Sequence, residues 1–253
     1  MLRTTMLRTV AAGIVVVGVS VGVAACGSSS SASTSAGAPT VLAAASLSKV
    51  FPEIVPSATY SFGGSGALAT QIAQGAPADV FAAASAKQPA VLVAKGLVDA
   101  PVKFATNRLV LIVPSENPVH IAGVTDITKP GVKLVICATS VPCGDYARGV
   151  FANLGITRAA MKNVVSNASD VTQVVAQVAL GQADAGFVYI TDAEAANGKV
   201  TVITLPAAAK PLTSDYIAVV KSGSHRAGAT AFVQSVLSPR GKAILRAAGF
   251  GAR

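Results

Sequence analysis

The sequence predicts an α/β fold, in which the short strands of largely parallel sheets alternate with helices. Short runs rich in Val, Ile and Ala recur along the chain and indicate buried strands. Between these runs, apolar residues recur three and four positions apart, as they do on one face of a helix. Strands that alternate with helices in this order are typical of α/β proteins.

In the first half of the chain, most predicted strands are apolar or β-branched runs that end at Ser, Gly or Pro. One helix is expected to begin at Ser65, because Leu68 and Ile72 lie four positions apart on one face before the pattern stops near Gly75. Strands are predicted at residues 41–45, 60–62, 78–82 and 107–113, and helices at 47–54, 65–75 and 88–95.

In the second half, the clearest helix follows Asp170, a typical N-cap residue. Four Val residues begin at Val171 with spacing i, i+3, i+4, i+7, and Gly181 ends the pattern. Another helix begins near Pro142 and is capped by Gly155. Strands are predicted at residues 133–138, 185–190 and 216–220, and two last helices at 231–237 and 243–248.

The N-terminus has the three parts of a secretory signal. Arg3 and Arg8 supply a positive start, residues 10–23 form an uncharged apolar run, and small residues lead to Cys26. The apolar run is shorter than the roughly 20 residues that a helix needs to cross a bilayer. We therefore expect residues 1–25 to be a cleaved signal peptide, with a membrane-spanning anchor as the alternative.

Residues 23–26 resemble a bacterial lipobox, in which the Cys thiol is lipidated after the preceding residues are removed. Acyl chains hold a domain at a membrane with about 0.8 kcal/mol per buried methylene, and stable anchoring needs more than one chain. Residues 27–39 are almost all Ser, Ala, Gly and Thr, as in a flexible tether. We expect residues 26–39 to be a lipidated Cys26 and its tether, on the extracytoplasmic face of the cell membrane.

Two further cysteines, Cys137 and Cys143, lie in the body of the chain. A disulfide is permitted outside the cytoplasm, and Val141-Pro142 indicates a turn between the two residues. Two free, partly buried thiols are the alternative, and the sequence does not separate the two states.

The charge pattern argues against a nucleic-acid partner. The formal net charge is +9, but Lys and Arg are scattered singly, without a cluster and without interleaved aromatic residues. We expect a solvated surface that weakly attracts anions.

The sequence lacks a recognisable catalytic set, so an enzyme is not predicted. His120 and His225 are isolated, and no His, Cys and Glu residues have metal-ligand spacing. The residues around Ser65 approach a nucleophile elbow but have Ala67 in place of its second Gly. A secreted serine hydrolase that uses Ser65 stays open as an alternative, although neither His is marked as its base.

Several strand-to-helix joints are built from small residues. The first turn of a helix has backbone N–H groups without internal partners and a partial positive charge, so it can bind an anion without Lys or Arg. Ser46 and Ser65 can each add a hydroxyl donor. Ordinary helix capping uses the same residues, so only convergence of several joints would make a site. The joints are Ala45-Ser46, Gly64-Ser65, Pro142-Cys143-Gly144 and Asp170-Val171.

Six motifs, in this order, resemble those of the periplasmic molybdate-binding proteins of ABC importers. The likeness extends from about residue 40 to the C-terminus. The motifs lie at residues 43–47, 61–68, 75–81, 141–144, 169–171 and 186–193.

The resemblance implies a two-lobed type II periplasmic-binding-protein fold, with two mixed sheets flanked by helices and the ligand in the cleft between the lobes. Lobe I would comprise residues 40–109 and 217–253, and lobe II residues 110–216. The crossing strands would lie near residues 107–113 and 215–220.

The resemblance also implies the ligand and its donors. A tetrahedral dianion is held in this family by Ser hydroxyls, backbone N–H groups and a Tyr hydroxyl, and no cofactor is implied. The matching positions are Ser46, Ser65, Cys143, Val171 and Tyr189, with Cys143 and Val171 acting through their N–H groups. Relatives often have Ala where this chain has Cys143, and Ser where it has Gly64 and Gly66.

Molybdate is the predicted ligand, because it is fully ionised at neutral pH and presents only acceptors to a site of donors. Tungstate matches it in size and charge and is expected to bind too. The implied partners are the permease and ATPase subunits of an ABC importer, and the receptor is expected to be a monomer. The alternatives are a receptor for sulfate or another oxyanion, and an iron(III) binder, which would need clustered Tyr and carboxylate side chains.

Overall fold

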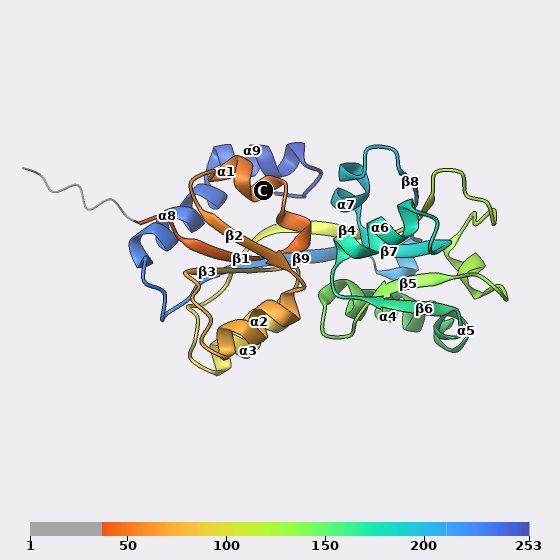
Figure 1. Cartoon of the computed structure of the whole chain (residues 1–253), viewed down its shortest axis with the longest axis horizontal. Coiled ribbons are helices and arrows are strands. Elements are labelled where there is room, and N and C mark those ends of the chain that lie inside the picture. The colour runs from red at the N-terminus through yellow and green to blue at the C-terminus, as the bar shows by residue number, and fades with distance from the viewer. Residues whose placement is uncertain (1–36, 211, 253) are drawn as a thin grey trace, which may run out of the picture. The chain divides into compact units, whose positions relative to one another are not determined.

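Residues 37–210 and 212–252 are described by the structure, a computed structural model (Figure 1). The predicted signal peptide, the lipidation site Cys26 and the tether up to residue 36 lie outside these residues. Within the two described ranges, no helix is long and apolar enough to cross a membrane.

A first sheet is built around β1, whose residues after Thr40 are apolar and buried. A strand buried on both faces is typical of a sheet that helices cover on both sides. β1 pairs in parallel with β2 and β3, and β3 pairs antiparallel with β9. The strands are β1 (Thr40–Ala44), β2 (Thr59–Gly63), β3 (Val80–Ala83) and β9 (Leu212–Val219).

A second sheet has the order β4-β7-β5-β6, with β8 on the other side of β4. β5 pairs in parallel with β6 and β7, whereas β4 pairs antiparallel with β7 and β8. The strands are β4 (Val102–Pro114), β5 (Leu134–Cys137), β6 (Val164–Ala168), β7 (Ala185–Tyr189) and β8 (Val200–Ile203).

The long strand β4 belongs to both sheets. Its residues from Val102 to Arg108 pair with β9, and those from Leu109 onwards pair with β7 and β8. The chain therefore passes from the first sheet to the second within one strand, near the crossing expected at residues 107–113. The exact boundaries of the two predicted lobes remain a prediction.

Helices cover both faces of each sheet (Figure 1). On the first sheet, α2 and α3 lie on one face and α1, α8 and α9 on the other; on the second, α4 and α5 lie opposite α6 and α7. Three short 3-10 helices lie in connections among the described residues: η1 (Ala45–Leu47), η2 (Val124–Thr128) and η3 (Ala207–Ala209). The helices are α1 (Val50–Ile54), α2 (Ser65–Ala73), α3 (Lys87–Ala94), α4 (Pro142–Asn153), α5 (Thr157–Lys162), α6 (Val171–Ala179), α7 (Ile190–Ala195), α8 (Arg226–Leu237) and α9 (Pro239–Ala247).

The core follows from the alternation of side chains along the strands. In the first sheet, Val41 and Ala43 point into the large core that continues through the second sheet, while Leu42 and Phe81 point into a smaller cluster under α2 and α3. Burial on both faces fixes the register of these strands, because a slip of one residue would exchange the two faces.

The predicted α/β class and the mixed sheets implied by the family resemblance are confirmed, whereas the largely parallel sheets expected from the local strand and helix patterns are not found. The antiparallel pairs all involve β4 or β9, the strands next to the passage between the sheets. Local sequence patterns do not report strand direction, so only the family resemblance indicated mixed sheets. The sequence reasoning also missed β6, β8, α5 and α7, and it began the helix predicted at 231–237 five residues too late, since α8 begins at Arg226.

Candidate functional site

A small cavity lies where the strand-to-helix joints of the two sheets meet. All five predicted site residues line it, together with backbone and small side chains that let a ligand approach closely. The lining residues are Ala44, Ala45, Ser46, Gly63, Gly64, Ser65, Ala84, Val141, Pro142, Cys143, Asp170, Val171 and Tyr189.

The cavity measures about 10 Å³, close to the space that one water molecule needs. Organic ligands occupy pockets many times larger. The size therefore favours a small inorganic ion over an organic molecule.

One side of the cavity, the first wall, is formed by joints of the first sheet. Ala44 at the end of β1 is the register partner of Gly63 at the end of β2, so the two following joints leave the sheet at the same edge. Ser46 is the second residue of η1 after the first strand, and Ser65 is the first residue of α2 after the second. This is the carboxyl edge of the parallel strands, where ligands collect in α/β proteins.

The two serine hydroxyls of the first wall are free to donate. Ser46 Oγ is buried and has no partner among the described residues. Ser65 is 1% exposed, and its Oγ accepts the N–H of Ala84 at 3.3 Å. Because that bond uses an oxygen lone pair, the hydroxyl hydrogen of Ser65 remains available for an acceptor in the cavity.

The opposite side, the second wall, includes the start of α4. Pro142 is the first residue of this helix, where its missing N–H is harmless. The N–H groups of Gly144 and Asp145 both donate to the carbonyl of Val141, at 3.0 and 3.2 Å. Cys143 precedes them in the first turn, and its N–H therefore lacks an acceptor within the helix.

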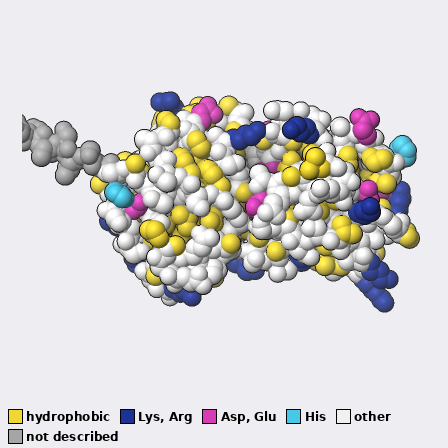
Figure 2. Space-filling view, viewed as in Figure 1, with side chains coloured by type: hydrophobic (Ala, Val, Ile, Leu, Met, Phe, Trp, Pro, Cys, Tyr) yellow, Lys and Arg dark blue, Asp and Glu magenta, His cyan; other side chains and the backbone are white. Residues whose placement is uncertain are grey.

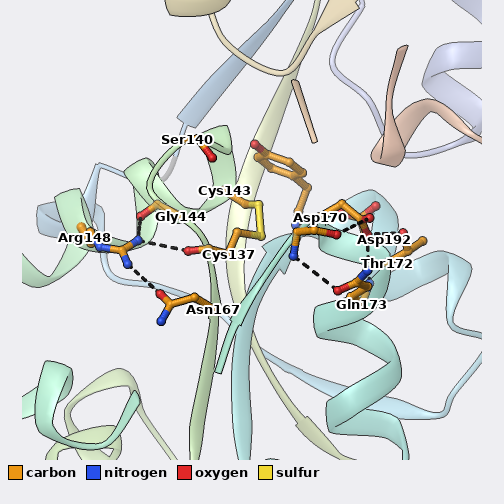
Figure 3. Close-up of a disulfide and its surroundings, with 12 residues drawn as sticks. Cys137, Ser140, Cys143, Gly144, Arg148, Asn167, Asp170, Thr172, Gln173 and Asp192 are labelled. Carbon is orange, nitrogen blue, oxygen red and sulfur yellow. Dashed lines mark hydrogen bonds between the residues drawn. A yellow bond between two sulfur atoms is a disulfide. The ribbon is translucent and has the colours of Figure 1, made fainter. Parts of the chain in front are cut away.

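The start of α6 contributes in the same way. The side chain of Asp170 caps the helix by accepting the N–H of Gln173 at 3.0 Å. Its carboxylate also accepts the hydroxyls of Thr172 and Ser169, so it is turned toward its own helix (Figure 3). Val171 is the first helical residue, so its N–H has no intrahelical acceptor and carries the positive end of the helix dipole.

A disulfide joins Cys137 at the end of β5 to Cys143, with a Cα–Cα distance of 5.7 Å (Figure 3). The sequence had left this pairing open. Arg148 holds the same turn from the other side, because its guanidinium donates to the carbonyls of Cys137 at 3.1 Å and Gly144 at 2.9 Å. The N–H of Cys143 is therefore fixed in position by a covalent bond and by a charged donor.

Tyr189 completes the second wall at the end of β7. Its side chain is 2% exposed, and its hydroxyl has no partner among the described residues. Burial raises the pKa of Tyr189 well above its ordinary value, and the negative charge of Asp215 raises it further. The phenol therefore keeps its proton at every physiological pH and can act as a donor.

Two buried carboxyl groups near Tyr189 were missed by the sequence reasoning. Asp192 accepts the N–H of Tyr189 at 3.0 Å, and burial raises its pKa to about 7. Asp215 on β9 is 1% exposed with Oδ2 unpaired among the described residues, and burial raises its pKa to about 8. The sequence did contain a signal for the burial of Asp215. Every second residue of a strand points to the same face, so Thr213 and Asp215 share a face with the apolar, buried Ile217.

The cavity does not have the groups that the alternative chemistries need. Among its described lining residues there is no Lys, Arg or His, and Tyr189 is the single Tyr. His225 lies instead beside Asp79, with Nδ1 3.1 Å from Oδ2. Ser65 thus has no base at hand in the described residues that line the cavity, and no clustered Tyr set for iron(III) is present there. On the face of the molecule drawn in Figure 2, the Lys and Arg side chains lie in small separate groups and not in one continuous patch.

Residues 39–251 match the family model described as bacterial extracellular solute-binding protein. The chain belongs to this family. Because the family consists of solute-binding proteins, the chain is a binding protein and not an enzyme, and the predicted family and two-lobed fold class are confirmed.

Individual relatives agree with this assignment. The solute-binding protein is 40% identical over 220 residues to the molybdate-binding protein ModA of Mycobacterium tuberculosis, covering 83% of each chain. The structure of the periplasmic molybdate-binding protein of Azotobacter vinelandii matches with a TM-score of 0.75 and 25% identity, covering 85% of this chain and 99% of that one. The sulfate-binding protein SubI of Mycobacterium tuberculosis matches with a TM-score of 0.70 at 21% identity, over 84% and 86% of the two chains, which shows the shared fold alone.

Proposed function

We propose that this solute-binding protein captures molybdate outside the cytoplasm. The observation that carries the proposal is the convergence of five donors on one small cavity whose described lining residues include no cationic side chain. Two of the donors, the hydroxyls of Ser46 and Tyr189, are buried and unpaired among the described residues. The 40% identity to a molybdate-binding relative supports the same ligand.

The chemistry of the donors selects the class of anion. A fully ionised tetrahedral dianion presents acceptors only, and each donor of the cavity can meet one of its oxygens. Protonated phosphate would need an acceptor for its own proton, but the carboxylate of Asp170 already accepts from its own helix start. Tungstate has the shape and charge of molybdate and should bind the same donors. Sulfate is the competing ligand, because it differs from molybdate mainly in size.

The remaining features of the proposal concern delivery. We propose that Cys26 carries lipid and that residues 27–39 tether the domain to the extracytoplasmic face of the membrane. The captured anion would pass to the permease subunit of an ABC importer, which a separate ATPase subunit drives. The receptor would act as a monomer, because one chain supplies all five donors.

A thermal-shift comparison of molybdate, tungstate, sulfate and phosphate tests the proposed ligand. A ligand at a hundred times its Kd stabilises the folded protein by about 2.7 kcal/mol, which raises the Tm of a protein of this size by about 5 to 10 °C. We expect this rise with molybdate and tungstate. No rise with molybdate, or an equal rise with sulfate at equal concentration, would contradict the assignment.

A further inference from the structure

Gly64 and Gly66, on either side of Ser65, lie against the second wall. A β-carbon on Gly66 would overlap the carbonyl oxygen of Ser140 and lie 2.8 Å from its carbonyl carbon. A β-carbon on Gly64 would overlap the carbonyl oxygen of Ser169 and lie 3.0 Å from Cγ2 of Val141. Real β-carbons essentially never approach other atoms closer than 3.0 Å, so a side chain at either position of this chain would require the facing backbone to shift.

The local backbone does not explain these glycines. Gly64 has φ of −66°, an ordinary extended conformation, and Gly66 lies inside α2 with no positive φ. At a helical position Ala is preferred over Gly by about 0.5–1 kcal/mol. By contrast, Gly75 and Gly155 have positive φ and open space around them, as expected of helix caps.

Three further side-chain contacts join elements of the two walls. Lys87 Nζ lies 2.8 Å from Asp145 Oδ2, and both side chains are about half exposed or more. Gln88 Nε2 donates to the carbonyl of Ser140 at 3.4 Å, a long bond, and Lys49 Nζ donates to the carbonyl of Ala195 at 2.7 Å. Exposed pairs of this kind contribute little to stability. These contacts can align the two walls.

We infer that Gly64 and Gly66 are positioning residues for anion capture: their missing side chains let the two walls meet, which brings both sets of donors within reach of one small anion. The inference rests on the proposed function. Ser46 and Ser65 belong to the first wall, whereas Cys143, Val171 and Tyr189 belong to the second. A methyl group between the walls displaces one set from the other, whereas N–H···O and O–H···O hydrogen bonds need donor–acceptor distances of about 2.5–3.2 Å.

The test is titration calorimetry of the purified protein with sodium molybdate and, separately, sodium sulfate. The variants are Gly66→Ala and Gly64→Ala, and the matched control is Gly149→Ala, since a β-carbon on Gly149 in α4 meets nothing within 4 Å. Each glycine variant should raise Kd at least about tenfold, the effect of losing one hydrogen bond to a charged group. The control should leave Kd unchanged.

Urea unfolding of the anion-free protein shows whether the two glycines are needed for folding or only for anion capture. If the walls meet only on capture, Gly66→Ala should unfold at the same urea concentration as the original protein or a higher one, because Ala favours the helix. A Kd within threefold of the original for both variants would overturn the inference, and so would a loss of unliganded stability in Gly66→Ala.

The outcomes for the inference and for the proposed ligand are distinct. If the original protein binds sulfate and not molybdate, the proposed ligand is wrong, and the ratio of Kd values for sulfate still decides the role of the glycines. If it binds molybdate and the glycine variants bind equally well, the ligand stands and the inference fails. Binding of neither anion would contradict both.

Discussion

Ser46 and Tyr189 each bury a hydroxyl group that pairs with no described residue. A buried polar group without a partner costs about 1–3 kcal/mol, so folding alone does not favour either hydroxyl at its position. Both line the same cavity. An acceptor bound there would satisfy both groups at once, and this explains why the chain keeps them.

Replacing Tyr189 by Phe should separate binding from folding. The change removes an unpaired buried hydroxyl, so the free energy of unfolding without anion should stay equal or rise by about 1 kcal/mol. The Kd for molybdate should rise about 10- to 100-fold, because one hydrogen bond to a charged group is lost. Urea unfolding and titration calorimetry give the two quantities. A large loss of stability with unchanged affinity would show that Tyr189 has only a packing role.

The buried carboxyl groups of Asp192 and Asp215 should make stability depend on pH. Burial raises their pKa values to about 7 and about 8, whereas an unfolded Asp has a pKa of about 3.9. Between about pH 4 and pH 8 the folded protein therefore binds more protons than the unfolded chain. Stability from these groups is complete below pH 4, falls as the pH rises through this window, and levels off above pH 8.

Asp215→Asn isolates one of the two groups. Near Asp215 lie Asp192, Tyr189 and Tyr146, none of them a cation. At pH 9 the variant should be more stable than the original by at least about 1 kcal/mol, and near pH 4 the two should be equal. Its molybdate affinity should also fall less above pH 8, since an ionised Asp215 repels a dianion. Parallel pH slopes of unfolding free energy for the two proteins would contradict this.

Among the elements, the start of α4 is held most firmly. The Cys137–Cys143 disulfide and the Arg148 guanidinium both fix the turn that carries the Cys143 N–H. Gly144 adds a third constraint, because a β-carbon there would overlap the carbonyl oxygens of Cys137 and Ala138. This element should therefore present its donor with little loss of freedom when an anion binds.

Reduction of the disulfide should weaken this element without unfolding the protein. Closing such a short loop contributes about 2 kcal/mol to stability, and the affinity for molybdate should fall only a few-fold, since Arg148 still holds the turn. Urea unfolding and calorimetry with and without dithiothreitol measure both effects. A variant with Cys137→Ser and Cys143→Ser is the control and should not respond to the reductant. Equal stability of the original protein in both conditions would contradict the structural role of the bond.

Elements with strong local signals were predictable from the sequence. The cap at Asp170 and the four-Val pattern placed α6 correctly, and Ser65 was correctly placed at the start of α2. β6 and β8 were missed because they are short and partly exposed, so their alternation resembles that of a loop. α7 was missed because it continues directly from β7 after Tyr189, with no Gly or Pro between them.

For the molecule as a whole, each strand-to-helix joint of the cavity could be predicted from a local sequence pattern, but the convergence of these joints on one cavity could not. The family resemblance supplied it, since no local rule relates Ser46 to Val171. The close approach of Gly66 to Ser140 was also unpredictable in principle, because it depends on how two separate sheets face each other. Backbone spacing between distant segments is a property of the whole fold.

The proposed lipid anchor at Cys26 is tested on the full-length chain. If Cys26 carries the lipid, Cys26→Ser should move the exported protein from the membrane fraction to the soluble fraction, because the acyl chains supply the membrane affinity. Cell fractionation followed by immunoblotting measures this, and the variant's molybdate affinity should be unchanged. Membrane retention of Cys26→Ser would instead favour an uncleaved apolar segment as the anchor.

The most direct measurement is a crystal structure of the protein grown with molybdate, with X-ray data collected at the molybdenum absorption edge. We expect one anomalous peak in the cavity between the two walls. Its oxygens should lie about 2.7–3.2 Å from Ser46 Oγ, Ser65 Oγ, the N–H groups of Cys143 and Val171, and the Tyr189 hydroxyl. A peak elsewhere, or a bound molybdate that contacts donors of only one wall, would contradict it.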